Sequence, residues 1–225
     1  MAQKSKQWAA IIMMIALFAM IAFVTNLCSP MATIVKNQFG ASELAGQIGN
    51  YANFIAYLVM GIPSGMLIAK LGYKKTALLA LIVGIVGIVF EYLSGVVGSY
   101  VIYLVGAFIS GLCMCMLNTV VNPLLNVLGG GGKTGNQLIQ IGGAANSAAA
   151  VAVYILMGAL IGEVTKSTGI SDATPALVIA GVIFVIAFVI LLFTKIEEPE
   201  QAKVELSLIT GALKFRQLSL GALAI

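Results

Sequence analysis

Long stretches without a charged side chain constrain this sequence more than any other feature. Its acidic and basic residues leave uncharged runs at 7–35, 44–69, 76–90, 92–132, 134–162 and 173–194. All but the third exceed the roughly 18 apolar residues that suffice to cross a bilayer as a helix, and the third is short because Glu91 ends it. Inside hydrocarbon each backbone N–H and C=O group must bond within its own segment, so such runs form helices. The sequence therefore predicts an all-α membrane protein with six transmembrane helices.

Composition excludes a soluble domain. Hydrophobic residues make up 60% of the chain and charged residues 9%, whereas a soluble domain carries about 25% charged residues. The apolar run that follows Lys6 lacks a small-residue cleavage site after a short apolar core. It therefore predicts a retained first span and not a removed signal peptide.

Basic residues are distributed unevenly between the two predicted sides of the membrane. If both ends of the six-helix bundle face the cytoplasm, only Lys36 and Lys166 lie outside. The residues that then lie inside are Lys4, Lys6, Lys70, Lys74, Lys75, Lys133, Lys195, Lys203, Lys214 and Arg216. Because cytoplasmic loops carry an excess of lysine and arginine, we expect a multi-pass protein of the cell inner membrane with both ends of the bundle cytoplasmic. The positive net charge then reflects topology and contact with anionic lipid, and no basic patch with interleaved aromatics suggests nucleic acid as a partner.

The predicted spans fall into one bundle followed by a linker. Residues 1–195 form the six-helix transmembrane bundle, 196–217 read as an acidic and polar cytoplasmic linker, and 218–225 read as the start of a truncated seventh span. Between the first two spans, Ser42 and Glu43 are typical of a helix start, because a serine caps the first turn and an acid favours the positive end of the helix dipole.

An internal repeat organises the bundle into two sets of three spans. The first span carries Asn26 followed by Pro30, and the fourth carries Asn118 followed by Pro123. Successive sets of three run in opposite directions through the membrane. This pattern predicts two inverted three-helix repeats, in which interrupted helices line a site near the bilayer midplane.

Amide side chains are the candidate functional groups of the interior. Asn118, Asn122 and Asn126 recur at four-residue spacing and so form one stripe on the fourth span. An amide left unpaired in hydrocarbon is costly, so the stripe faces either neighbouring helices or a water-filled cavity. Such amides can tie helices together, or they can bind the hydroxyl groups of a sugar, because an amide both donates and accepts hydrogen bonds.

A neutral interior rich in amides suits a neutral polyol. The predicted substrate-binding residues are Asn26, Asn53, Tyr57, Asn118, Asn122, Gln140 and Asn146. Glu91, near the outer end of the third span, is expected to be a solvated carboxylate at the membrane interface.

The sequence offers no residues for catalysis or for a cofactor. It contains no histidine, so histidine-assisted nucleophiles and soft metal sites are excluded. Cys28, Cys113 and Cys115 fall inside predicted spans, where a thiol packs as a small apolar group. The glycines before Lys133 do not form a phosphate-binding loop, because the first glycine of that motif would fall on Val127. We therefore expect a protein that is not an enzyme and holds no cofactor or metal.

The run from Asn118 to Gly129 reads N-T-V-V-N-P-L-L-N-V-L-G. It is similar to the fourth-span E-T-x-x-N-P…V-L-G signature of the fucose and glucose/galactose permease family of the major facilitator superfamily. Asn26 to Pro30 resembles its first-span N-x-x-D-P, Ile62 to Gly65 its second-span exit, and Asn146-Ser147 its fifth-span N-S.

The resemblance implies the amino-terminal half of a twelve-helix permease that carries a neutral hexose by alternating access. It implies sugar contacts from Asn26, Asn118, Asn122 and Asn146. It also implies that the missing carboxyl-terminal half, or a second copy of the chain, completes the pathway.

Three positions depart from the family pattern. The family's first-span aspartate falls on Ser29, its fourth-span glutamate on Asn118, and a fifth-span glutamine on Gly143. In the family the two acids are associated with proton coupling and substrate binding. The resemblance therefore implies sugar binding but leaves proton symport, sodium coupling and facilitated diffusion open.

Two other classes of membrane protein could also contain six spans. A six-span water or polyol pore needs two Asn-Pro-Ala half-helices, and only Asn122-Pro123-Leu124 is present, within a long span. A non-transporting sensor or assembly protein derived from a truncated permease stays open, because six helices enclose only half of a cavity.

Overall fold

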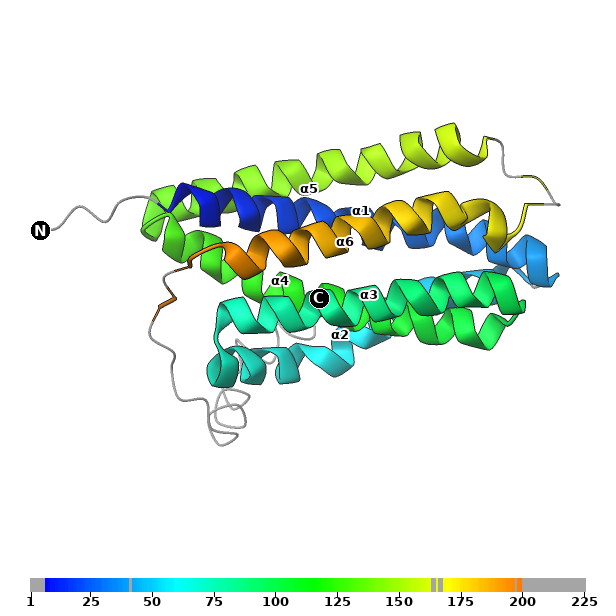
Figure 1. The fold of residues 1–225 in the computed structure, drawn as a ribbon, viewed down its shortest axis with the longest axis horizontal. Helices are drawn as coiled ribbons and strands as arrows, with labels where there is room; N and C mark the ends of the chain where they lie inside the picture. The colour runs from blue at the N-terminus through cyan, green and yellow to red at the C-terminus, as the bar shows by residue number, and fades with distance from the viewer. Residues whose placement is uncertain (1–6, 41, 163–164, 166–167, 197, 200–225) are drawn as a thin grey trace, which may run out of the picture.

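The computed structural model describes residues 7–40, 42–162, 165, 168–196 and 198–199. In this part of the chain, antiparallel helices form one bundle (Figure 1). They are α1 (Trp8–Phe39), α2 (Glu43–Leu71), α3 (Tyr73–Val97), α4 (Tyr100–Leu128), α5 (Gly132–Ile161) and α6 (Thr174–Phe193), the last preceded by the short 3-10 helix η1 (Ile170–Ala173). The described residues thus contain 6 helices that are long and apolar enough to cross a membrane. The predicted fold class is confirmed.

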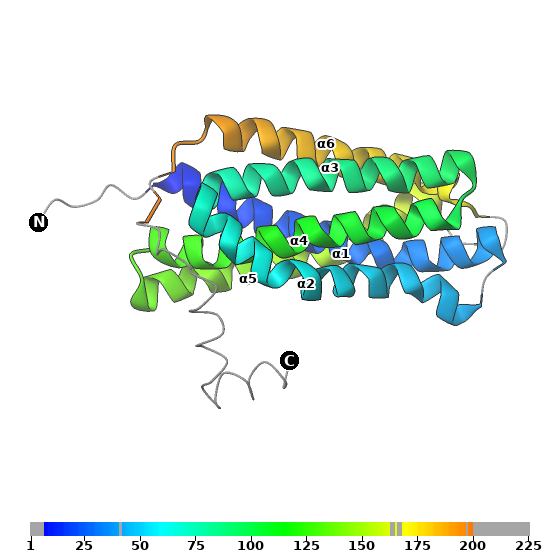
Figure 2. The same ribbon diagram turned by 90° about the horizontal axis from the view of Figure 1, so that it is seen from below.

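The helices lie in three layers of two. Figure 2 shows α3 and α6 along one side of the bundle, α2 and α5 along the other, and α1 and α4 between them. Buried side chains concentrate in the middle layer, where Leu17 of α1 and Leu117 of α4 are fully enclosed. Polar side chains in the middle of α1 and α4, such as Asn26 and Asn118, are accordingly at least partly buried.

The two sets of three helices occupy corresponding places, as the inverted-repeat prediction requires. Helices α1 and α4 share the centre, and the remaining two helices of each set flank them. The expected interruption of α1 and α4 is wrong, because both are continuous α-helices through Pro30 and Pro123. Each proline removes one N–H donor, so the carbonyl oxygens of Asn26 and Thr119 lose their usual helical partner while the helix continues.

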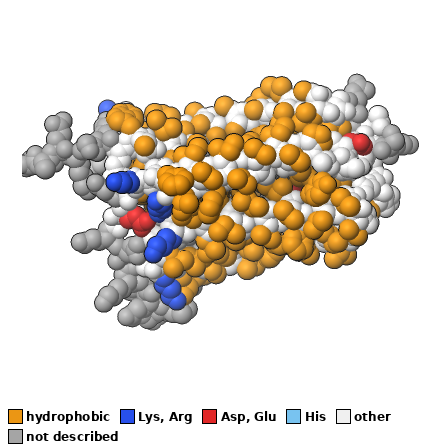
Figure 3. Space-filling view, viewed as in Figure 1, with side chains coloured by type: hydrophobic (Ala, Val, Ile, Leu, Met, Phe, Trp, Pro, Cys, Tyr) orange, Lys and Arg blue, Asp and Glu red, His pale blue; other side chains and the backbone are white. Residues whose placement is uncertain are grey.

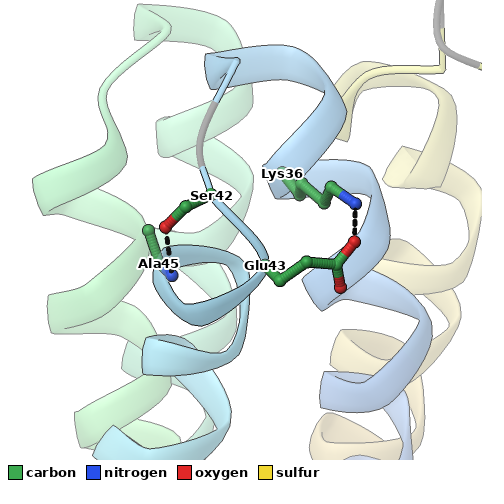
Figure 4. A network of polar contacts seen from close by, with 4 residues as sticks. All are labelled: Lys36, Ser42, Glu43 and Ala45. Carbon is green, nitrogen blue, oxygen red and sulfur yellow. Dashed lines mark hydrogen bonds and ion pairs between the residues drawn. The ribbon is translucent and has the colours of Figure 1, made fainter.

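The turn between α1 and α2 confirms the predicted helix start. The Ser42 hydroxyl accepts a hydrogen bond from the Ala45 N–H at 3.2 Å, and the neighbouring Glu43 pairs with Lys36 of α1 (Figure 4). Gly40 ends α1 at a φ of 57°, a left-handed conformation that glycine adopts without a steric penalty. The cap and the glycine together set the sharp reversal from α1 into α2.

Helices α3 and α4 approach each other closely along a stripe of small residues. A Cβ atom built on Gly87 would lie 2.8 Å from the Ser110 backbone nitrogen, and one on Gly106 would lie 2.8 Å from the Glu91 backbone nitrogen. Small residues allow such backbone contact between membrane helices. Glu91 lies in this interface, 5% exposed, and accepts a hydrogen bond from the Ser110 hydroxyl at 2.9 Å. The expectation of a solvated interfacial carboxylate is therefore wrong.

The segment that follows α6 returns to the first turn of α3. The Glu198 carboxylate accepts hydrogen bonds from the backbone N–H groups of Tyr73 and Lys74, both at 2.9 Å. The Lys74 ammonium group donates to the Leu192 carbonyl oxygen at 2.9 Å. These bonds hold residues of α6 and its exit against α3. Residues 200–225, which carry most of the predicted linker and the predicted seventh span, lie outside the described residues, so that division of the chain stays a prediction.

Replacing Glu198 with alanine is expected to lower the stability of the bundle. Two N–H groups at the start of α3 lose their acceptor, and removing a helix cap costs about 0.5–2 kcal/mol. The measurement is the apparent melting temperature of the purified protein in detergent. Glu43→Ala is the control, because its exposed ion pair is worth about 0–1 kcal/mol. A larger loss in the control than in Glu198→Ala would contradict the capping role.

The outer surface has the pattern of a membrane-spanning bundle. Figure 3 shows a broad apolar belt along the helices, with lysine side chains gathered at one end of the molecule. Lys70 stands in the last turn of α2, Lys74 and Lys75 in the first turn of α3, and Lys133 in the first turn of α5. The protein is thus a multi-pass membrane protein whose described lysines lie mainly on one side, Lys36 being at the opposite end of α1.

Candidate substrate-binding site

A cavity of about 300 Å³ lies between α1, α2, α4 and α5. Its volume is at the lower end of the roughly 300–1,000 Å³ range typical of ligand pockets. The lining residues are Phe18, Ile21, Ala22, Thr25 and Asn26 of α1, Tyr57 of α2, Asn118 of α4 and Asn146 of α5. Tyr57 is the central residue of α2, and Asn146 lies at the middle of α5. The cavity is therefore at mid-height in the bundle.

Three amides, a phenol and the Thr25 hydroxyl supply the polar wall of this cavity. The Asn118 side-chain N–H donates to the Tyr57 hydroxyl at 2.9 Å, which joins α4 to α2. The Asn146 amide donates to the Phe18 carbonyl oxygen at 2.8 Å, which joins α5 to α1. The Asn26 amide donates to the Ala22 carbonyl oxygen of its own helix at 2.8 Å. These hydrogen bonds fix one polar side chain from each of the four helices α1, α2, α4 and α5 in the cavity wall.

These bonds leave hydrogen-bonding capacity facing the cavity. An asparagine amide has two N–H donors and a carbonyl oxygen with two lone pairs. For each of Asn26, Asn118 and Asn146, the structure records a single side-chain donation within the described residues. The remaining N–H groups and carbonyl oxygens can bond ligand hydroxyls. Phe18 and Ile21 add apolar surface on which the C–H face of a sugar ring can pack.

The cavity is neutral. None of its lining residues carries a charge. A charged ligand would enter it without a counterion, which is unfavourable inside a membrane protein. The site therefore suits an uncharged ligand with many hydroxyl groups.

The structure separates the other predicted site residues from this cavity. Asn122 donates to the Asn118 backbone carbonyl oxygen at 3.1 Å, and Asn53, 2% exposed, donates to the Cys28 sulfur at 3.5 Å. Gln140 lines a different cavity, together with Lys133 and Asn136 near the start of α5. Of the predicted substrate-binding residues, Asn26, Tyr57, Asn118 and Asn146 come together.

Asn126, the last member of the amide stripe, ties two helices together. Its side chain donates to the Asn136 side-chain oxygen of α5 at 3.0 Å. A Cβ atom on Gly135 would lie 2.5 Å from the Asn126 carbonyl oxygen, so α4 and α5 touch here through their backbones. The amide stripe therefore has both of the predicted roles: Asn118 lines the cavity, and Asn126 joins two helices.

Sequence reasoning missed part of the α1 wall. Phe18, Ala22 and Thr25 follow each other at four- and three-residue spacing, which places them on the same helix face as Asn26. Their helical spacing from Asn26 could have identified these three residues as part of the same wall from the sequence alone. The three cysteines, in contrast, are buried as the sequence predicted.

Comparison with known proteins places the chain in a family. Residues 12–223 match the sequence profile of the Major Facilitator Superfamily. The chain is 23% identical to the glucose/galactose transporter of Brucella abortus (strain 2308) over 215 residues, which are 93% of this chain and 52% of that protein. It is 27% identical to the L-fucose-proton symporter of Escherichia coli (strain K12) over 114 residues, which are 51% of this chain and 26% of that protein. These relatives are transporters, so the expectation that the chain is not an enzyme is confirmed.

Solved structures agree with this fold. The crystal structure of the transporter FucP in the outward conformation aligns with a TM-score of 0.75 at 19% identity, covering 98% of this chain and 56% of that chain. A second structure of the Escherichia coli fucose:proton symporter aligns with a TM-score of 0.72 over the same shares. The chain spans about half the length of the relatives it matches. It belongs to the Major Facilitator Superfamily, where it resembles the amino-terminal half of the fucose and glucose/galactose permeases.

Proposed function

We propose that this chain forms one half of a permease that carries a neutral hexose across the inner membrane by alternating access. The observation that carries the proposal is the uncharged cavity at mid-height, walled by Asn26, Tyr57, Asn118 and Asn146. The names of the relatives, glucose/galactose transporter and L-fucose-proton symporter, support a hexose as the substrate class.

The arrangement of helices around the cavity supports movement as well as binding. Transporters built from inverted repeats hold their substrate near the midplane, between the repeats. Here the cavity takes residues from α1 and α2 of the first set and from α4 and α5 of the second. A sugar held by both sets would be released when the sets rock against a second bundle.

The partner in this scheme is a second six-helix unit that covers the side of the bundle formed by α2 and α5. Within the described residues, these two helices bury few side chains, whereas α1 and α4 bury many. The second unit would be either the remainder of a longer protein or a second copy of this chain. The end that carries Lys70, Lys74 and Lys133 would face the cytoplasm, following the positive-inside rule.

Replacing Asn146 with alanine is expected to weaken hexose binding. The cavity loses one amide from its α5 wall, and a hydrogen bond contributes about 0.5–1.5 kcal/mol, or roughly 2- to 13-fold in affinity. The measurement is exchange of radiolabelled glucose, galactose and fucose by proteoliposomes that contain the complete protein. Gln140→Ala is the matched control, because Gln140 is an amide of the same helix that lines a different cavity.

The outcome of that experiment separates the proposal from its alternatives. A loss of affinity in Asn146→Ala with wild-type behaviour in Gln140→Ala is the expected result. The opposite pattern would move the sugar site to the cavity beside Lys133. Hexose binding by the wild-type protein without any exchange would instead favour a non-transporting sensor.

A further inference from the structure

A second polar cluster lies between α1, α2, α3 and α4, outside the central cavity. Its members are the buried residues Cys28, Asn53, Glu91, Tyr103 and Ser110. The Ser110 hydroxyl donates to Glu91 at 2.9 Å, and the Asn53 amide donates to the Cys28 sulfur at 3.5 Å. The sugar site proposed above uses none of these side chains, so the cluster requires its own explanation.

Glu91 is placed within the membrane-spanning part of α3. It precedes the end of the helix at Val97 by six residues, a rise of about 9 Å at 1.5 Å per residue. Within the described residues, the ion pair that the structure records is Lys36 with Glu43, at the outer end of α1. A buried carboxylate without a cation is strongly disfavoured relative to the neutral acid.

The groups that face Glu91 are neutral or can become only negative. The titratable side chains near it in the cluster are Cys28 of α1 and Tyr103 of α4, which can lose a proton but not gain one. Helix α2 contributes the neutral Asn53 to the cluster, and α6 has no titratable residue between Thr174 and Phe193. The acids on neighbouring elements lie away from it: Asp172 of η1 is exposed and accepts from the Gly169 N–H, Glu43 at the start of α2 is exposed and pairs with Lys36, and Glu198 accepts from N–H groups at the opposite end of α3. Glu91 therefore gains or loses its charge by exchanging a proton with water that reaches it.

A series of buried polar groups leads from Glu91 towards the central cavity. The Tyr103 hydroxyl and the Asn53 carbonyl oxygen are buried and have no hydrogen-bond partner in the described part of the chain. The Tyr103 hydroxyl lies against Gly49 of α2, where a Cβ atom would be 2.7 Å away. Gly49, Asn53 and Tyr57 follow at four-residue spacing and share one face of α2. Tyr57 then lines the cavity.

We propose that the carboxyl group of Glu91 is a proton-binding site that exchanges with the central cavity through Tyr103, Asn53 and Tyr57. A hydronium ion in the cavity supplies the proton and becomes water, the carboxylate becomes the neutral acid, and water takes the proton back as hydronium when Glu91 ionises. The two unpartnered oxygens are the places where transient water molecules are bound, and the proton moves along these waters and the hydroxyl groups of Tyr103 and Tyr57. Such orphaned buried atoms are rare in proteins and call for a partner of this kind.

Infrared difference spectroscopy tests the proton site without any sugar. In membranes that contain the complete protein, a protonated-carboxyl C=O band that changes with pH is expected in the wild type. The band should vanish in Glu91→Gln, which keeps an acceptor for the Ser110 hydroxyl. It should persist in Glu43→Gln, whose side chain is 85% exposed. A spectrum without such a band, or a band that survives in Glu91→Gln, would overturn the proposal.

Tyr103→Phe tests the route while leaving Glu91 in place. This change removes a hydroxyl that has no partner, so the protein should fold as the wild type does. In D₂O the Glu91 carboxyl band should shift more slowly in Tyr103→Phe than in the wild type. Equal exchange rates would exclude Tyr103 from the route, and with it the proposed path.

Hexose binding as a function of pH tests coupling between the two sites, and this arm rests on the proposed sugar-binding function. Two linked sites change each other's affinity by the same factor, typically about 5- to 150-fold. Hexose affinity should therefore vary with pH in the wild type and in Glu43→Gln, and become independent of pH in Glu91→Gln. Unchanged pH dependence in Glu91→Gln would refute the coupling. Failure of the wild type to bind any hexose would instead refute the proposed function, while the infrared result would still decide the proton site.

Discussion

Replacing Gly87 with leucine is expected to prevent assembly of the bundle. A Cβ atom at this position would lie 2.5 Å from the Ser110 hydroxyl oxygen and 2.8 Å from the Ser110 backbone nitrogen. The second contact is with backbone, which no side-chain rotation can relieve. Overpacking a well-packed interior, which forces side chains off their rotamers and shifts the backbone, typically costs about 1–3 kcal/mol and occasionally more. Forcing α3 away from α4 would also break the bond between Glu91 and Ser110.

The expected readout is loss of the monodisperse peak in detergent size-exclusion chromatography. Gly87→Ala should retain part of this peak, with a lower melting temperature. Gly61→Ala is the matched control, because Gly61 is a helical glycine with nothing within 4 Å of an added Cβ atom. If Gly87→Leu assembled as well as Gly61→Ala, the close approach of α3 and α4 would be refuted.

Replacing Asn118 with leucine is expected to cause the largest loss of hexose binding among single changes in the cavity. The substitution removes the amide that α4 contributes and leaves the Tyr57 hydroxyl without the donor 2.9 Å away. A site that has lost one polar group and left another unpaired binds a hydroxylated ligand poorly. Affinity should fall by at least about 10-fold, or 1.4 kcal/mol. Equilibrium binding of a radiolabelled hexose to the purified protein is the measurement.

Asn122→Leu is the matched control for that change. Asn122 belongs to the same stripe one turn further along α4, but its amide donates to the backbone of its own helix and it does not line the cavity. Its replacement should leave hexose affinity within about twofold, because a lost bond to an internal backbone carbonyl leaves the ligand contacts intact. Equal losses in the two variants would show that the stripe acts through packing and not through contact with sugar.

The fold was largely predictable because lipid removes most alternatives. Charged residues mark the ends of each apolar run. Inside lipid the backbone groups of such a run have no water to bond with, so they must bond to one another as a helix. The predicted start of α2 at Ser42 and Glu43 was correct for a local reason, since a cap depends on the next turn alone. The continuity of α1 and α4 through proline was not predictable in this way. Proline is tolerated inside membrane helices where neighbouring helices, side chains or water bond the freed backbone groups, and helical spacing alone does not show such partners.

The candidate site was predictable in part. Helical spacing indicated that Asn118 belongs to a polar stripe. Spacing does not show which neighbouring helix covers each position of the stripe. The different surroundings of Asn118, Asn122 and Asn126 were therefore not predicted. Gln140 and Asn146 are six residues apart, and at 3.6 residues per turn they point about 120° apart. That angle argues against a shared cavity, as the structure then showed. Glu91 was misplaced because its burial follows from two glycines that let α3 and α4 meet.

A structure of the protein determined in the presence of its best-bound hexose tests the central claim most directly. We expect the sugar in the cavity at mid-height, with its hydroxyls bonded to Asn26, Asn118 and Asn146. A hexose bound elsewhere, such as beside Lys133 and Gln140, with the cavity of Asn118 left closed, would contradict this account.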